Sequence, residues 1–262
     1  MVGLYGPLTL HVPLRFWFCK NPSMYLPLLA LQYHPVSLNI TIRPLNRLFI
    51  IDNPSANPPD QSVSPVSITS MNLYGDYIHL DIEERRRFVA NSHEYLIEQV
   101  QYTSSYAIES TSQTVQVPME FNNPIRELYW MIQRDASLNA NQYFNYMNYT
   151  IGESASSSQN LISTALLRIE GYDRFDIRNA DYFRLVQPYQ YHTVVPIDDY
   201  VYSYSFCFRP EDIQPSGSMN ASRLNTITLQ LEMNTAVVPA RGTANVRIYA
   251  LNHNILRIVD GF

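Results

Sequence analysis

The chain has 262 residues, of which 46% are apolar and only 16% are charged, and its formal net charge is −5. This length and apolar content allow the chain to bury a core, which excludes wholesale disorder. The acidic balance argues against a nucleic-acid binder, which normally carries a basic face. The 20 tyrosines favour strands and also suit packing against neighbours, and we expect both effects here.

No targeting or membrane-spanning segment is evident in the sequence. Residues 1–14 lack a basic region and contain Pro7 and Pro13, which is unlike a secretory signal. The most apolar stretch, residues 24–31, is interrupted by Pro27 and is far too short to cross a bilayer.

The two cysteines, Cys19 and Cys207, both lie inside apolar strand-like runs. We therefore expect buried free thiols and no disulfide, which fits a reducing compartment.

Segments with alternating apolar and polar residues dominate the chain and predict β-strands. The pattern is clearest at residues 36–42, 227–233 and 246–250. Since alternate side chains of a strand point to opposite faces, each segment has one buried and one wetter face. Further strand candidates lie at residues 8–18, 28–33, 73–80, 95–102, 114–119, 127–133, 165–170 and 201–208. Many short strands separated by Pro, Asn and Ser predict an all-β, antiparallel sandwich or barrel.

Helical signals are few. Asp81, followed three residues later by Glu84, predicts the N-cap of a short helix that ends near residues 90–91. The basic run 85–87 follows two glutamates and is interpreted as a solvated helix face. A second helical turn is expected around residues 177–183.

Three polar stretches predict loops, at residues 52–65, 135–160 and 187–199. Loops of about 20 residues inside a compact β domain are unusual and are often functional.

The predicted helix separates two strand-rich parts of the chain. Residues 93–262 are numerous enough for a complete eight-stranded jelly roll. Residues 1–92 contain only four or five strand candidates, too few to close a second sandwich alone.

Motifs that carry chemistry are scarce, so the sequence predicts no enzyme, no cofactor and no metal site. The six histidines are scattered, and the metal spacings H-x-H, H-E-x-x-H and C-x-x-C do not occur. Neither a G-x-S-x-G motif nor a glycine loop for phosphate is present. The acidic pair Asp198 and Asp199 is interpreted as part of a solvated loop.

Several sequence blocks together resemble the major capsid proteins of nucleocytoplasmic large DNA viruses. They are residues 14–18, 21–22 and 26–34, then DIEERRRF at 81–88 and HEYLIEQ at 93–99, then 172–175, 182–190 and 214–218 with Asn220, Ser222 and Arg223. The blocks are moderately specific one by one, but they are ordered along nearly the whole chain and make a strong resemblance together.

The resemblance implies a structural role. Proteins of this family have two successive jelly rolls, three copies form a pseudo-hexagonal capsomer, and capsomers tile an icosahedral shell over an internal membrane. It therefore implies a homotrimer whose partners are neighbouring capsomers, penton proteins and minor capsid proteins. The expected location is the virion, after assembly in the host cytoplasm, with no insertion into the membrane and no direct contact with nucleic acid.

The resemblance also implies a domain division. Residues 1–92 correspond to the C-terminal part of the first jelly roll with a linker helix, and residues 93–262 correspond to the second jelly roll. The first strands of the first jelly roll are missing from the sequence. Because an open half-sandwich exposes strand edges and apolar surface, we expect the same or another polypeptide to supply them.

The candidate assembly residues come from the family-like blocks. They are Arg174, Arg184, Gln187, Pro188, Gln214, Pro215, Ser216, Gly217 and Arg223. Residues 214–217 predict a turn, because Pro215 fixes φ and Gly217 permits a positive φ. This turn either joins two strands only or also fixes Arg223 at a contact between domains or subunits, and the alternatives are compatible.

The arginines Arg174, Arg178 and Arg184 alternate with the aspartates Asp173, Asp176 and Asp181. This pattern is consistent with an ion-pair network at a trimer interface. Such a network would set register more than affinity, because surface ion pairs contribute only about 0–1 kcal/mol each.

An alternative function is a glycan-binding jelly roll of a viral surface protein. In that case residues 135–160, with Tyr143 and Tyr146, would form the sugar site.

Overall fold

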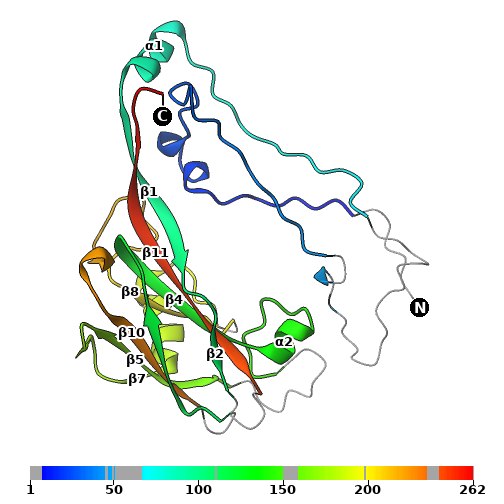
Figure 1. Cartoon of the computed structure of the whole chain (residues 1–262), viewed down its shortest axis with the longest axis vertical. Helices are drawn as coiled ribbons and strands as arrows, with labels where there is room; N and C mark the ends of the chain where they lie inside the picture. The colour runs from blue at the N-terminus through cyan, green and yellow to red at the C-terminus, as the bar shows by residue number, and fades with distance from the viewer. Residues whose placement is uncertain are drawn as a thin grey trace. The chain divides into compact units, whose positions relative to one another are not determined.

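The computed structural model describes residues 8–44, 47–48, 50, 67–109, 111–149, 159–197, 199–234 and 242–261 (Figure 1). Among these residues the strands are β1 (His93–Tyr102), β2 (Tyr106–Ile108), β3 (Thr114–Met119), β4 (Pro124–Arg134), β5 (Ile162–Ile169), β6 (Tyr172–Asp173), β7 (Arg178–Asn179), β8 (Tyr202–Ser205), β9 (Met219–Asn220), β10 (Ile227–Met233) and β11 (Ala244–Ile258). The α-helices are α1 (Ile82–Ala90), α2 (Asp135–Asn139) and α3 (Gln187–Tyr191).

The strands form two sheets. In the first sheet the order is β1-β11-β4-β8, with β2 beside β11 and β9 beside β4. In the second sheet the order is β3-β10-β5-β6, with β7 beside β5. The central strand β4 runs antiparallel to β11 and β8, and β10 runs antiparallel to β3 and β5. The predicted all-β, antiparallel class with few short helices is therefore confirmed.

The core lies between the two sheets and follows the alternation of the sequence. On β10 every second residue is buried, from Ile227 through Leu229 to Met233. Leu128 and Trp130 of β4 join the same apolar cluster from the other sheet. Trp130 also stacks on Tyr202 of β8, with ring centroids 6.1 Å apart. The cluster residues therefore pack between the two sheets, while the Trp130–Tyr202 contact joins two neighbouring strands of the first sheet.

The strands predicted before residue 81 are absent from the described part of that region, so those predictions were wrong. Residues 8–44 and 67–80 contain only short 3₁₀ turns, at Trp17–Cys19 and Pro22–Met24. A strand forms only where a neighbouring strand accepts its backbone hydrogen bonds, and no such neighbour is present for these segments among the described residues. The predicted loop at 52–65 lies outside the described residues.

Cys19 is exposed, so the prediction that its thiol is buried was wrong, while the burial of Cys207 is confirmed. Cys19 ends the 3₁₀ turn Trp17–Cys19, in which no residue is buried. Both cysteines are free.

Helix α1 begins and ends where the sequence predicted. The Asp81 carboxylate accepts a hydrogen bond from the Glu84 backbone N–H at 2.9 Å, as an N-cap does. Arg86 pairs with Glu83 at 3.0 Å, and both side chains are exposed. The basic run is therefore a solvated helix face, as expected.

The predicted loop at 187–199 begins with a helix, α3, and the second helical turn comes later than predicted, as a π-turn at Tyr182–Val186. Pro188 has no N–H to donate and follows directly on the π-turn, where the Gln187 backbone N–H donates to the Tyr182 carbonyl. The predicted loop at 135–160 likewise begins with the short helix α2.

The chain divides into two compact units. One contains residues 1–38, 76–98 and 255–262, and the other contains residues 39–75 and 99–254. Strands β1 and β11 contribute residues to both units. The candidate site described below lies entirely in the second unit.

Candidate functional site

The candidate site lies on the face of β4 that points away from the core. Leu128 faces the core, so its neighbours Glu127 and Tyr129 lie on the opposite face. The register places Glu127 beside Ser205 and Tyr129 beside Ser203 of β8. Although this face is polar, Glu127, Ser203 and Ser205 are buried.

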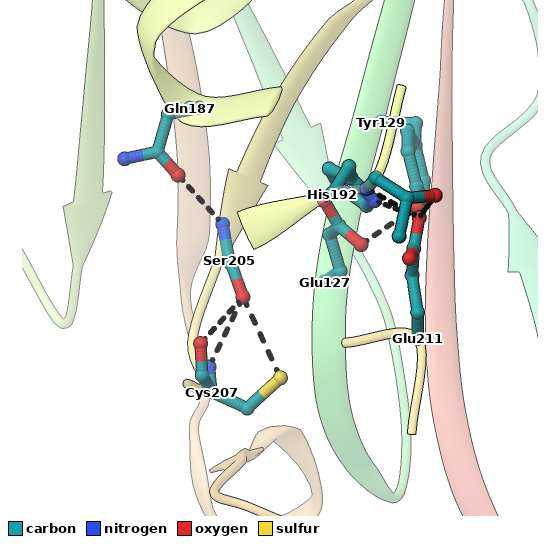
Figure 2. A network of polar contacts seen from close by, with 8 residues as sticks. Glu127, Tyr129, Gln187, His192, Ser205, Cys207 and Glu211 are labelled. Atoms are coloured by element: carbon teal, nitrogen blue, oxygen red, sulfur yellow. Dashed lines mark hydrogen bonds and ion pairs between the residues drawn. The ribbon is translucent and has the colours of Figure 1, made fainter. Parts of the chain in front are cut away.

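Gln187 and Pro188, two of the predicted assembly residues, are buried in α3. The Gln187 side-chain oxygen accepts a hydrogen bond from the Ser205 backbone N–H at 3.1 Å (Figure 2). Its amide donates to the Tyr182 hydroxyl at 2.9 Å. Gln187 therefore ties α3 and the π-turn to β8 within the chain.

A second polar network joins α3, β4 and the loop after β8 (Figure 2). The Nε2 atom of His192 lies 2.6 Å from a carboxylate oxygen of Glu127. Its Nδ1 atom lies 3.3 Å from a carboxylate oxygen of Glu211. The Tyr129 hydroxyl donates to the other Glu127 oxygen at 2.7 Å. The backbone N–H of Thr193 donates to Glu211 at 3.1 Å.

The network shifts the ionisation of its members. The hydrogen bond to Glu127 raises the pKa of His192, against the effect of burial, and Glu211 adds to the rise. Burial raises the pKa of Tyr129 strongly, and the Glu127 carboxylate raises it further, so the phenol stays a donor. The Thr193 backbone hydrogen bond lowers the pKa of Glu211.

A pocket of about 130 Å³ adjoins this network. Its walls are the apolar side chains of Pro188, Val194, Pro196 and Val201, together with Tyr129, His192 and Ser203. The segment after α3 thus covers the outer face of the first sheet.

Within the described part of one chain the predicted arginines and aspartates pair at separate sites, and the network expected at a trimer interface stays a prediction. Arg184 pairs with Asp181 at 3.0 Å and lies over the Tyr200 ring, 4.8 Å from its centroid. Asp173 instead pairs with Arg168 of β5 at 2.8 Å. These aspartates are divided between two sites because Asp173 lies on β6, beside Arg168, whereas Asp181 lies at the π-turn.

Arg174 and Arg178 each interact with a tyrosine. Arg174 is exposed and interacts with Tyr204, where its charge and hydrogen bond oppose the rise in the tyrosine pKa caused by burial. The guanidinium of Arg178 lies over the Tyr182 ring, 4.6 Å from its centroid.

Residues 214–217 show a bend at Gln214 but no assigned turn, and at Gly217 they cross close to another segment. Gly217 has a φ of +140° and lies against the backbone of Phe206 and Cys207, where a Cβ would be 3.2 Å from the nearest atoms. The Ser216 hydroxyl accepts from the Arg209 backbone N–H at 2.8 Å. These contacts fix the loop to the end of β8.

Gln214, Pro215 and Arg223 are all exposed. Arg223 ends the 3₁₀ turn Ala221–Arg223. Gly217 and Ser216 therefore contact backbone atoms of the same chain, whereas Gln214, Pro215 and Arg223 remain on the surface.

Sequence reasoning missed Glu127, His192 and Glu211 as a group. It predicted a strand at residues 127–133 but did not predict that the residues on both faces of β4 are almost all buried. The available signal was the uninterrupted apolar and aromatic run at 128–132, since a strand buried on both faces lacks alternation.

Among the described residues, no group of three or more His, Cys, Asp or Glu side chains is placed to hold a metal ion. Within the same residues, no helix has both the length and the apolar character needed to cross a membrane.

Comparisons with known proteins find related families over nearly the whole chain. A family described as "Large eukaryotic DNA virus major capsid protein" matches residues 84–262, and one described as "Major capsid protein N-terminus" matches residues 6–81. The major capsid protein of Phaeocystis pouchetii virus is 35% identical over 97% of this chain and 64% of its own length. That of Paramecium bursaria Chlorella virus 1 is 33% identical over 96% and 64%.

Solved structures show the same relationship. The quasi-atomic PBCV-1 virus capsid contains a chain with 32% identity and a TM-score of 0.57, over 71% of this chain and 54% of that one. This similarity confirms the predicted jelly-roll class. The chain spans about 60–64% of the length of the first curated relatives it matches. From its sequence and its fold, the chain belongs to the major capsid protein family of large eukaryotic DNA viruses.

Proposed function

We propose that this protein is a structural subunit of an icosahedral virus shell, which acts by assembly and not by catalysis. The observation that carries the proposal is the match of residues 84–262, which contain the β-sandwich, to the major capsid family. The proposed location is the virion, after assembly in the host cytoplasm.

We propose two domains, with residues 1–92 as the C-terminal part of a first jelly roll plus α1, and residues 93–262 as the second jelly roll. The two family matches support this division, because one ends at residue 81 and the other begins at residue 84.

The exposed apolar side chains of the first part support a missing partner. Val36, Leu38, Ile40 and Ile42 alternate as strand residues do, yet they are 55%, 38%, 52% and 44% exposed. Several large apolar side chains exposed on one short segment indicate a surface that another segment covers. The remaining strands of the first jelly roll, from the same or another polypeptide, would pair with this segment and cover it.

The proposed assembly is a homotrimer that forms a pseudo-hexagonal capsomer, next to other capsomers, penton proteins and minor capsid proteins. Of the candidate residues, Arg174, Gln214, Pro215 and Arg223 are exposed and available for contacts with another subunit. Gln187 and Pro188 are buried and would act on the interface only by shaping the surface above them.

The test is the molar mass of the intact gene product at micromolar concentration, measured by size-exclusion chromatography with light scattering. Assembly predicts three times the subunit mass, which is 30.3 kDa for the present chain. Arg223→Glu should shift the protein toward monomer, because it reverses an exposed charge near the proposed contact. Arg86→Glu reverses an exposed charge on α1 and is the matched control. A purely monomeric product would contradict the proposal.

The glycan-binding alternative is not favoured by the geometry of its predicted site. The Tyr143 ring is covered by the Arg43 guanidinium at 4.0 Å, and its hydroxyl donates to Asn141. The ring face and the hydroxyl, which a sugar would need, are therefore engaged within the chain. Saturable sugar binding that Tyr143→Ala abolishes would reverse this conclusion.

A further inference from the structure

His192 lies between two carboxylates that come from different parts of the chain. Glu127 is on the central strand β4 and is fully buried, whereas Glu211 is on the loop after β8 and is exposed. The two ring nitrogens face them at 2.6 Å and 3.3 Å, one carboxylate for each nitrogen (Figure 2).

This arrangement fits only one protonation state of the ring. A neutral imidazole has one N–H and one lone pair, so it can donate to one carboxylate but must turn its lone pair toward the other. The imidazolium donates from both nitrogens. The geometry therefore calls for a protonated His192, whose charge also balances the buried Glu127.

The other groups that face His192 leave it the main titrating group near neutral pH. From β4, Tyr129 donates its hydroxyl to Glu127 and stays protonated. The Arg126 guanidinium is directed to the Asp212 carbonyl at 3.3 Å. On the loop, Arg209 and Asp212 pair with each other at 3.6 Å. The other residues that line the adjoining pocket, among them Ser203 and Val201, are uncharged.

The network joins two covering segments to the sheet. His192 ends α3 and leads into residues 193–197, which line the pocket. Glu211 receives hydrogen bonds from both the backbone and the hydroxyl of Thr193. Since the Glu211 contact is the longer and more exposed of the two carboxylate contacts, it is the one to break first.

We propose that His192 acts as a pH-responsive clasp. While its ring is protonated, it holds residues 192–197 and the 209–213 loop against the outer face of β4. When the ring loses a proton, it releases Glu211. Deprotonation leaves one donor for two carboxylates, and the buried Glu127 retains it. The cover then opens while the sandwich core remains folded.

The test is hydrogen–deuterium exchange of the full chain at about pH 6 and about pH 9, corrected for the intrinsic exchange rate. From the lower to the higher pH we expect the protection of residues 193–197 and 209–213 from exchange to fall. The fall should be about tenfold for each unit by which the pKa of the His192 ring is higher in the closed state than in the open state. Core strands β4 and β10 should keep their protection at both pH values.

Two variants separate the clasp from a general effect of pH. His192→Gln removes the titrating group. Glu211→Gln places an amide beside Nδ1 of His192, and this amide can donate a hydrogen bond to the deprotonated nitrogen. Both variants should therefore abolish the pH step, which is the change in protection between the two pH values. His79→Gln, at an exposed position, is the matched control and should keep the step. Equal protection of the wild-type segments at both pH values, or an unchanged step in His192→Gln, would overturn the proposal.

Discussion

At the scale of single residues, the outer face of β4 shows how burial and charge are reconciled. Glu127 has no exposed surface, yet it lies on the strand face that points away from the core. An isolated buried carboxylate is costly, and here His192 and Tyr129 each offer it a hydrogen bond. The polar side chains on the outer face of β4 therefore form hydrogen bonds with one another.

The shifted pKa values predict how stability depends on pH. Because the folded protein raises the pKa of His192, this residue contributes its full stabilisation below the ordinary value of 6.5 and loses it as pH rises through the folded pKa. Glu211 acts oppositely, since its pKa is lowered from 4.5, and its contribution is lost as pH falls through the folded value. Urea midpoints measured across pH should therefore be highest between these limits. In His192→Gln the loss of stability on the alkaline side should disappear, and its persistence would refute the assignment.

Alternation on β10 gives a paired test at the same scale. Leu229 is 1% exposed in the core, so Leu229→Asp buries an unpaired charge and should cost more than about 4 kcal/mol of the free energy of unfolding. Thr228, one residue earlier, faces outward and lies beside Arg168 of β5. Thr228→Asp should change stability by less than about 1 kcal/mol. Urea unfolding measures both, and equal losses would mean that the strand faces are misassigned.

The sequence identifies some site residues better than others. The positive φ of Gly217 could be predicted from the residue type and its place two residues after a proline, although no turn is assigned there. The pairing of His192 with Glu127 and Glu211 could not, because 65 and 19 residues separate them along the chain. Only the fold of α3 over the first sheet brings these three side chains together.

At the scale of elements, a strand is predictable when the chain also contains its neighbour. The bounds of β3 equal those of its predicted segment, β10 ends at the predicted residue, and these two strands pair with each other in the second sheet. Residues 36–42 have the same alternation, but the described residues contain no strand beside them. Local pattern decides which segments are able to form strands, and hydrogen-bonding partners decide which of them do.

Helix α3 is predicted to hold its place on the sheet mainly through Gln187. Gln187→Leu keeps the volume but leaves the buried Ser205 backbone N–H without its acceptor, so we expect a loss of about 1–3 kcal/mol in the free energy of unfolding. Gln190→Leu, on an exposed position of the same helix, is the matched control and should change stability by less than about 0.5 kcal/mol. Urea denaturation of the two variants measures the difference, and indistinguishable midpoints would show that the Gln187 hydrogen bonds do not anchor α3.

At the scale of the whole molecule, the described structure combines a closed apolar core with a segment whose apolar residues remain exposed. The core of the sandwich uses residues from both sheets, from Val117 on β3 to Ile248 on β11. Residues 8–42, by contrast, expose most of their large apolar side chains. A subunit that completes its surface with further strands and with copies of itself accounts for both features.

Electron microscopy of the purified intact gene product tests this account most directly. The account predicts class averages with three-fold symmetry and a pseudo-hexagonal outline, in which each subunit contributes two β-sandwiches. Averages that show only single, unassociated copies at micromolar concentration would contradict it.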